Sequence, residues 1–136
     1  RALDDGSAAA KFLALVRAQG GDPSLLEAGQ LFQPAPVVVD LVAVRDGVLT
    51  ACDCFALGEL VVHIGGGRRA KDDSVDPRVG LVLLRARGER VARGEAFARL
   101  HLAHPDDAAV NRAVACFTIG DSAPAPLPDD LVLERV

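Results

Sequence analysis

The sequence predicts an α+β fold, in which helices and strands occupy separate stretches of the chain rather than alternating. Three observations support this prediction. Apolar residues make up 50% of the 136 residues, which is enough to close a hydrophobic core. Their spacing changes along the chain between the period of helices and the β-branched runs typical of strands. Glycine or proline marks each change, as expected of turns.

The first part of the chain predicts two helices. Ser7 is expected to be the N-cap of the first helix, whose apolar residues recur at helical spacing until Gly20 ends it. A short second helix is expected over residues 24–28. Residues 33–36 contain two prolines, which disfavour helix in the residues before them, so an extended connector is expected there.

Two strands and a third helix are expected next. Residues 36–44 are rich in valine, which favours a strand. Asp46-Gly47 is a turn signal of the kind that joins hairpin strands, and residues 48–51 are expected to return as the next strand. From Asp53, the expected cap of the third helix, apolar residues recur at helical spacing until Gly65 to Gly67 end the helix.

The rest of the chain predicts short elements separated by polar turns. Residues 68–78 are charged and contain a proline, so we expect a surface loop. His104-Pro105 is expected to start a last helix that runs to Cys116, with Asp106 and Asp107 in its first turn, where the helix dipole favours acidic side chains. Strands are expected over residues 79–86, 96–102, 117–119 and 131–136.

Composition and charge argue against several classes of function. The 15 basic and 19 acidic residues give a net charge of −4, which argues against a dedicated nucleic-acid or anionic-membrane surface. Trp and Tyr are absent, so no platform for stacking bases is expected. No apolar run approaches the roughly 20 residues that cross a bilayer, and the first residues do not resemble a secretion signal. A cytoplasmic protein is therefore expected.

The cysteines and histidines do not form a metal-binding pattern. Cys52 and Cys54 have C-x-C spacing rather than the C-x-x-C of zinc and redox motifs, and Cys116 is the remaining thiol. His101 and His104 lie three residues apart at a strand end, so their rings should point to opposite faces. We therefore expect free thiols and no metal, and no catalytic Ser/His/Asp or Cys/His set can be assembled.

A glycine-rich segment is the most distinctive candidate site. Gly65 to Ala70 fits the dinucleotide pattern G-x-G-x-x-A, but a helix precedes it and charged residues follow, whereas such a site needs a strand before and a helix after. The segment could instead be a mobile loop that closes over an anionic substrate, or a solvated turn held by its own ion pairs. The residues concerned are Gly65, Gly66, Gly67, Arg68, Lys71, Asp72 and Asp73.

Two successive turns suggest a particular architecture. Residues 87–91 and 92–96 place G-x-x-V-x-x-G between two apolar strands, as in half of a barrel-sandwich module. Biotinyl and lipoyl carrier domains share this shape and carry their cofactor on a lysine in a tight hairpin. No lysine lies between residues 11 and 71, which disfavours a swinging-arm carrier. A free-standing barrel-sandwich binding or carrier module remains an alternative.

Three stretches of the sequence resemble a known family. KFLALVRAQGGD (residues 11–22), the stretch with GGGRRAKDDSVD (residues 46–83) and GERVARGEAFARLH (residues 88–101) are similar, in this order, to the C-terminal part of the thymidine and pyrimidine-nucleoside phosphorylases. The sequence departs from the family at Gly66, where Ala is common, and at Ser74, where Pro is common.

The resemblance implies a fold and an activity. Residues 1–33 would be the last helices of an α/β domain, and residues 34–136 a C-terminal α/β-hammerhead domain. The family is homodimeric and catalyses the reversible phosphorolysis of thymidine to thymine and 2-deoxyribose 1-phosphate, with inorganic phosphate as co-substrate and no cofactor. The family's base and phosphate contacts lie upstream, in its α and α/β domains. No catalytic or substrate-binding residue therefore carries over, and the chain alone is expected to be inactive.

The resemblance also suggests a role for the glycine-rich segment. In an enzyme whose domains close on the substrate, residues 65–76 would be a mobile loop that helps to exclude water, with Arg68 and Lys71 making polar contacts across the cleft. In a rival interpretation, the chain is an interaction domain, and the apolar face of the helix over residues 7–19 docks a partner.

Overall fold

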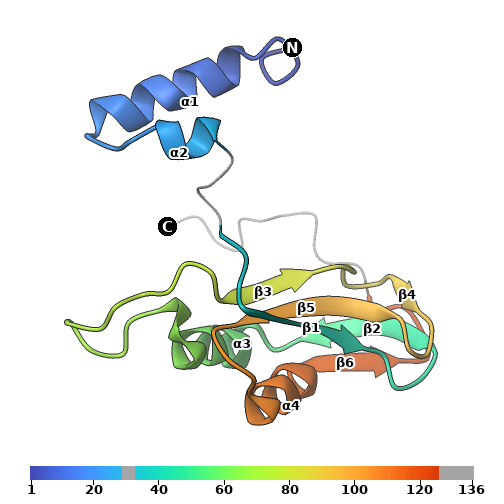
Figure 1. The fold of residues 1–136 in the computed structure, drawn as a ribbon. Coiled ribbons are helices and arrows are strands. Elements are labelled where there is room, and N and C mark those ends of the chain that lie inside the picture. The colour runs from blue at the N-terminus through green and yellow to red at the C-terminus, as the bar shows by residue number, and fades with distance from the viewer. Residues whose placement is uncertain (29–32, 126–136) are drawn as a thin grey trace, which may run out of the picture. The chain divides into compact units, whose positions relative to one another are not determined.

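The chain folds into a mixture of helices and antiparallel strands, which confirms the predicted α+β class (Figure 1). The computed structural model describes residues 1–28 and 33–125. The chain divides into two compact units, Arg1–Pro34 and Ala35–Val136. The strand predicted over residues 131–136 lies outside the described residues. Among the described helices, none has the length and apolar character needed to cross a bilayer.

The first unit contains α1 (Ser7–Ala18) and α2 (Ser24–Glu27). The prediction that Ser7 caps α1 is wrong, because the N-cap is Gly6, which adopts a left-handed conformation with φ 78°. Ser7 is the first helical residue, and its backbone N–H donates to Oδ1 of Asp5 at 2.9 Å. The Asp5 carboxylate thus satisfies a free N–H of the first turn, as an N-cap side chain normally does.

Gly20 ends α1 as predicted. It has φ 79°, and its N–H donates to the carbonyl oxygen of Arg17 at 3.0 Å. The N–H of Gly21 donates to the carbonyl oxygen of Val16 at 2.9 Å, which completes a Schellman motif. No residue of α1 is buried, and the apolar side chains of Phe12 and Leu15 remain 51% and 52% exposed.

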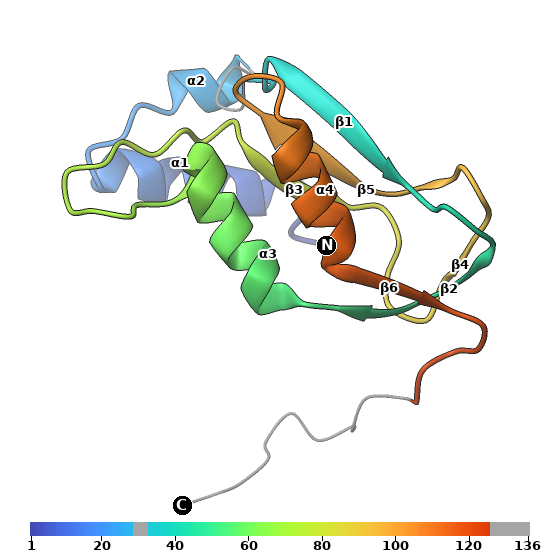
Figure 2. The same ribbon diagram turned by 90° about the horizontal axis from the view of Figure 1, so that it is seen from below.

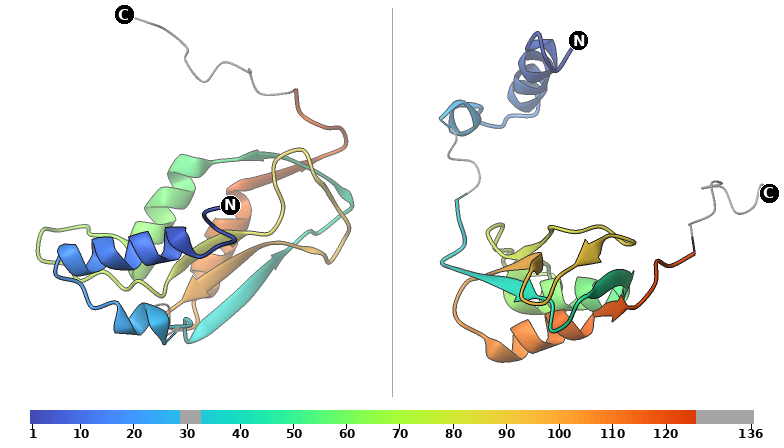
Figure 3. Two further views of the ribbon diagram at one scale, coloured as in Figure 1. Left: turned by 90° about the horizontal axis from the view of Figure 1, so that it is seen from above. Right: turned by 90° about the vertical axis from the view of Figure 1, so that its right-hand side faces the viewer.

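The second unit contains two three-stranded antiparallel sheets among its described residues. The first sheet has the order β1-β5-β3, and its strands are β1 (Val37–Val42), β5 (Ala96–Leu102) and β3 (Gly80–Leu83). The second has the order β4-β2-β6, and its strands are β4 (Arg90–Val91), β2 (Gly47–Cys52) and β6 (Phe117–Gly120). Helices α3 (Cys54–Val61) and α4 (Asp107–Ala115) lie side by side on one face of the β1-β5-β3 sheet (Figures 2 and 3).

The predicted hairpin at Asp46-Gly47 does not form. β1 pairs with β5, whereas β2 pairs with β4 and β6, so the turn carries the chain from one sheet into the other. The two strands belong to different sheets because both sheets contribute side chains to one hydrophobic core. Leu41 of β1 enters this core from one sheet, and Leu49 of β2 enters it from the other. The core also includes Phe97, which is 1% exposed and meets Phe117 edge to face with ring centroids 5.0 Å apart.

Other elements also differ from prediction. β3 stops at Leu83 instead of residue 86, because Arg85 and Ala86 already belong to the following turn. β4 has only two residues and was not predicted. His104 and Pro105 precede α4, and Asp106 is its N-cap rather than part of its first turn; Oδ1 of Asp106 accepts the N–H of Ala109 at 2.9 Å.

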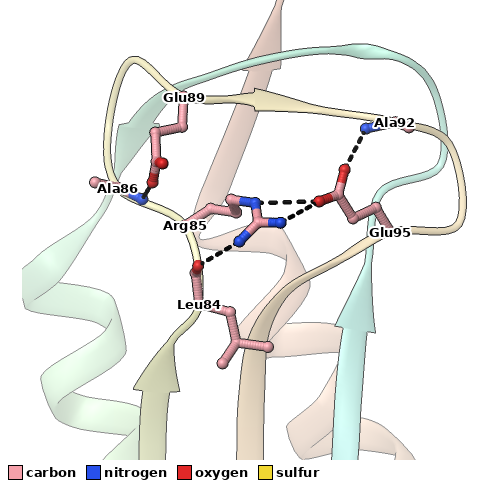
Figure 4. A network of polar contacts seen from close by, with 6 residues as sticks. All are labelled: Leu84, Arg85, Ala86, Glu89, Ala92 and Glu95. Carbon is pink, nitrogen blue, oxygen red and sulfur yellow. Dashed lines mark hydrogen bonds and ion pairs between the residues drawn. The ribbon is translucent and has the colours of Figure 1, made fainter.

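The two predicted turns are copies of one another (Figure 4). Residues 86–89 and 92–95 both read Ala-Arg-Gly-Glu. In each copy the glycine has a positive φ, and the glutamate carboxylate accepts the N–H of the alanine three residues before it. The equivalent residues are Gly88 (φ 93°) and Gly94 (φ 84°), and Glu89 and Glu95.

Each copy also joins a different part of the chain by the same pair of backbone hydrogen bonds. Leu49 exchanges such bonds with the first copy, and Ala43 exchanges them with the second. The four bonds are Gly88 N–H to Leu49 O (2.7 Å), Leu49 N–H to Glu89 O (3.0 Å), Gly94 N–H to Ala43 O (2.7 Å) and Ala43 N–H to Glu95 O (2.9 Å). Arg85, the residue before the first copy, contacts the second copy, since its Nε donates to Oε1 of Glu95 at 3.1 Å (Figure 4).

Candidate functional site

The glycine-rich segment follows directly from the end of α3. Asp53 caps this helix as predicted, and its Oδ1 accepts the N–H of Ala56 at 2.9 Å. The helix continues past Val61 as a π-helical turn, Val62–Gly66. Gly65 has φ 101°, a conformation that residues with a side chain rarely adopt, so the helical path ends there.

The next two glycines are required by close packing. A Cβ atom on Gly66 would lie 2.8 Å from Cγ1 of Val61, and one on Gly67 would lie 2.7 Å from Cγ2 of Val62. Both distances are shorter than van der Waals contact, so the chain can turn back over the end of α3 because these positions lack side chains. The glycine run therefore has a steric role besides the mobility that its sequence suggests.

The loop from Gly65 to Asp76 is closed at its base. The backbone N–H of Asp76 donates to the carbonyl oxygen of Gly65 at 2.9 Å. The Asp76 carboxylate accepts two hydrogen bonds from the guanidinium of Arg78, at 2.9 and 2.7 Å. These bonds lower the pKa of Asp76 to about 2. A loop of this length whose ends meet is a compact Ω-type loop.

Asp73 organises the middle of the loop. Its Oδ2 accepts the backbone N–H groups of Arg69 and Ala70, both at 2.9 Å. The hydrogen bond from Ala70, followed by that from Arg69, lowers the pKa of the Asp73 carboxyl. Asp73 is therefore a structural residue of the loop.

The other charged candidates face solvent. Arg68, Lys71 and Asp72 are exposed, and none of them makes a hydrogen bond or an ion pair within the described part of the chain. Asp73 and Asp76 thus hold the backbone of the segment, whereas two cations at its tip, Arg68 and Lys71, have no partner within the described residues.

A hollow of about 790 Å³ lies beside this loop. Sequence reasoning did not find it, because its wall combines α3, the loop and α4. The sequence indicates only the part of the wall that α3 forms, because helical spacing places Phe55, Glu59 and Val62 on one face of that helix. The lining residues are Cys54, Phe55, Gly58, Glu59, Val62, His63, Arg69 and Arg112.

The three cysteines lie in the described part of the chain as free thiols, as predicted. Cys52 is half-buried, Cys54 is exposed and Cys116 is buried. Burial, followed by the neighbouring Cys54, raises the pKa of the Cys52 thiol to about 11. Within the described residues, no group of three or more His, Cys, Asp or Glu side chains is placed to hold a metal ion.

Comparison with protein families places most of the second unit in a known family model. The model of the pyrimidine nucleoside phosphorylase C-terminal domain matches residues 48–120. The match begins in β2 and ends with β6, so it includes the glycine-rich loop, the hollow and both Ala-Arg-Gly-Glu turns.

Comparison with curated proteins extends the match to almost the whole chain. The thymidine phosphorylase of Sinorhizobium medicae (strain WSM419) is 39% identical over 131 residues, which cover 94% of this chain and 30% of that protein. The thymidine phosphorylase of Sinorhizobium fredii (strain NBRC 101917 / NGR234) is 37% identical over 139 residues, 100% of this chain and 31% of its own length. The thymidine phosphorylase of Burkholderia orbicola (strain MC0-3) is 39% identical over 130 residues, which cover 93% of this chain and 30% of that protein.

Proposed function

Because this chain belongs to the pyrimidine nucleoside phosphorylase family, we propose that it is the C-terminal part of a thymidine phosphorylase. The observation that carries the proposal is the continuous match of nearly the whole chain to proteins of that name at 37–39% identity. The chain spans 30–31% of the length of these relatives. The remaining length would supply the α and α/β domains that we expect from the family resemblance.

The reaction of the complete enzyme would be the reversible phosphorolysis of thymidine. Inorganic phosphate attacks C1′ of the nucleoside, the glycosidic bond breaks, and the products are thymine and 2-deoxyribose 1-phosphate. We place the enzyme among the pentosyltransferases, as a cytoplasmic homodimer that needs no cofactor. The chain by itself would be inactive, because the family's base and phosphate contacts match none of its residues.

The architecture that we propose for residues 34–136 is the α/β-hammerhead, a relative of the barrel-sandwich fold. Two features support it. The sheets β1-β5-β3 and β4-β2-β6 share one core. The paired Ala-Arg-Gly-Glu turns, with equivalent hydrogen bonds to Leu49 and Ala43, give the unit the internal repetition expected of a sandwich built from two halves. Residues 1–33 would belong to the preceding domain.

The glycine-rich loop would close over the active site of the complete enzyme. Its base is fixed between Gly65 and Asp76, and its exposed cations Arg68 and Lys71 lack partners among the described residues. A loop with a fixed base and unpaired charges at its tip can acquire partners when a second domain approaches. Polar contacts of Arg68 and Lys71 across the cleft would then help to exclude water from the reaction.

A domain replacement tests the proposed function. In the Sinorhizobium medicae enzyme, the segment that matches this chain is replaced by the chain itself, and thymine release from thymidine is measured with and without phosphate. We expect phosphate-dependent release by the hybrid protein. We expect none from the isolated chain, and none from the enzyme that lacks the segment.

Two results would contradict the proposal. Phosphorolysis by the isolated chain would show that its own residues perform the chemistry. A hybrid protein that is folded and dimeric but inert would show that the chain is not equivalent to the segment it replaces. A lipoyl or biotinyl adduct found by mass spectrometry would favour the carrier alternative instead.

A further inference from the structure

The hollow beside the glycine-rich loop has the composition of a ligand site. It measures about 790 Å³, within the range of roughly 300–1,000 Å³ typical of small-molecule pockets. Its wall combines charged groups with apolar and aromatic surface from three separate elements, as the lining residues named above show. Binding sites commonly have such a mixture, because apolar surface supplies affinity and a few polar groups fix orientation.

Two arginines from different elements line the hollow. Arg69 comes from the loop, where Asp73 fixes its backbone, and Arg112 comes from α4. Neither guanidinium makes a hydrogen bond or an ion pair within the described residues. Among the lining residues, the two arginines outnumber the one carboxylate, that of Glu59, although Arg69 also attracts the nearby carboxylate of Asp73. The hollow therefore suits an anion.

Aromatic and apolar surface lies beside these cations. Phe55 in the first turn of α3 is 77% exposed, which is unusual for so large an apolar side chain. Val62 follows two turns later on the same helix. Gly58 lies between them, and a Cβ atom built there would meet nothing within 4 Å. The absence of a side chain at Gly58 thus leaves open space on the wall of the hollow that Phe55 also lines.

We propose that this hollow binds an organic phosphate that carries an aromatic ring, the class to which mononucleotides belong. The phosphate would lie between Arg69 and Arg112, and the ring would pack against Phe55 over Gly58. A phosphate fits this arrangement better than a carboxylate, because a phosphomonoester carries a charge of about −1.5 to −2 and offers oxygens on several sides to two separate cations. The proposal does not depend on the proposed function, since it concerns binding by the chain itself.

Binding of thymidine 5′-monophosphate to the 136-residue chain tests the proposal. The probe is titrated while amide resonances are followed by NMR, with thymidine and inorganic phosphate titrated in parallel. We expect saturable binding, with shifts centred on Phe55, Gly58, Arg69 and Arg112. Thymidine lacks the charge and phosphate lacks the ring, so both should bind at least about tenfold more weakly.

Three variants locate the site. Arg69→Gln and Arg112→Gln should each weaken binding about tenfold, because each removes a charge-assisted contact. Gly58→Leu should abolish binding by filling the space beside Phe55, and leucine suits a helix interior. Arg90→Gln is the matched control: Arg90 is exposed and unpaired in the described structure but does not line the hollow, so binding should be unchanged.

Several outcomes would overturn the proposal. They are the absence of saturable binding, binding that Arg112→Gln and Gly58→Leu leave unchanged in folded protein, and equal affinity for inorganic phosphate. Tight binding of an acidic, aromatic peptide without binding of the nucleotide would also overturn it, and would identify the hollow as a protein-docking surface.

Discussion

The backbone N–H of Asp76 lies 2.9 Å from the carbonyl oxygen of Gly65, so the glycine-rich loop begins and ends at one point. The Asp76 carboxylate is held in turn by Arg78. This anchor separates the loop into a fixed base and an exposed tip. It makes the pH dependence of the loop predictable.

Acidification should break the contact between the Asp76 carboxylate and Arg78 only near pH 2. The hydrogen bonds from Arg78 lower the pKa of Asp76 from its usual 3.8 to about 2. A carboxyl with a lowered pKa stabilises the folded state above its unfolded pKa, and this contribution is lost as the pH falls through the folded value. Carboxyl carbon NMR should therefore report an Asp76 midpoint near 2. In Arg78→Gln the midpoint should move toward 3.8; an unchanged midpoint would show that Arg78 does not hold the carboxylate.

Gly65→Ala should destabilise the second unit. The substitution places a side chain at φ 101°, which costs about 1–2 kcal/mol of unfolding free energy even though space for the methyl group is open. Gly58→Ala is the matched control: it lies within α3 and also has open space, but with ordinary helical geometry, so it should stabilise by about 0.5–1 kcal/mol. Urea denaturation of both variants measures the difference. Equal changes in unfolding free energy for the two variants would show that the backbone conformation at Gly65 does not determine the cost of adding a side chain there.

The sequence predicted the elements better than their pairing. Each of the helices expected before residue 117 exists, because apolar periodicity and caps such as Asp53 are local signals. The hairpin at Asp46-Gly47 failed because a turn signal does not say which strand will be the neighbour. That choice depends on burial of Leu41 and Leu49 in one core, which no local pattern encodes.

The candidate site was also predictable only in its local part, the glycine-rich motif, and not in its spatial arrangement. The glycine-rich loop stood out as a contiguous motif, although the contacts that require Gly66 and Gly67 to be glycine appear only in the fold. The hollow could not be predicted, because Arg69 and Arg112 come to line one space only through the packing of α4 beside α3. Ser7 was misassigned because Gly6 takes the N-cap position, and the Asp5 carboxylate accepts the N–H of Ser7, the first helical residue.

Phe97→Ala should cost far more stability than Phe55→Ala. Phe97 is 1% exposed and packs on Phe117 in the core, and truncation of such a residue typically costs about 3–5 kcal/mol. Phe55 is 77% exposed, so its truncation should leave the unfolding free energy within about 0.5 kcal/mol. Chemical denaturation of the two variants checks this. Similar losses would mean that the Phe55 ring is buried in solution.

Thiol reagents should discriminate among the cysteines. Cys54 is exposed, whereas Cys116 is buried and the pKa of Cys52 is raised to about 11, so that about one thousandth of Cys52 is thiolate at pH 8. Iodoacetamide at pH 8 should therefore modify Cys54 first, as peptide mass mapping can show. In denaturant all sites should react at similar rates. Modification of Cys116 as fast as Cys54 in the native protein would contradict the packing around α4.

Removing both cations at the tip of the loop should impair catalysis without unfolding the protein. Arg68→Ala/Lys71→Ala is introduced into the hybrid phosphorylase described above. If the loop closes over the cleft, kcat/KM for thymidine should fall about tenfold or more, because contacts made only on closure are lost. The melting temperature should stay unchanged, since neither side chain has a partner within the described residues.

The control for this variant is Lys11→Ala/Arg90→Ala, which removes the same two charges at exposed positions outside residues 65–76. It keeps the net charge equal to that of the loop variant, so any general electrostatic attraction of phosphate toward the protein changes equally in both. A specific role of the loop therefore predicts a loss in the loop variant alone. Equal kinetics in the two variants would show that, for catalysis, residues 65–76 are a solvated surface turn whose backbone Asp73 and Asp76 hold in place.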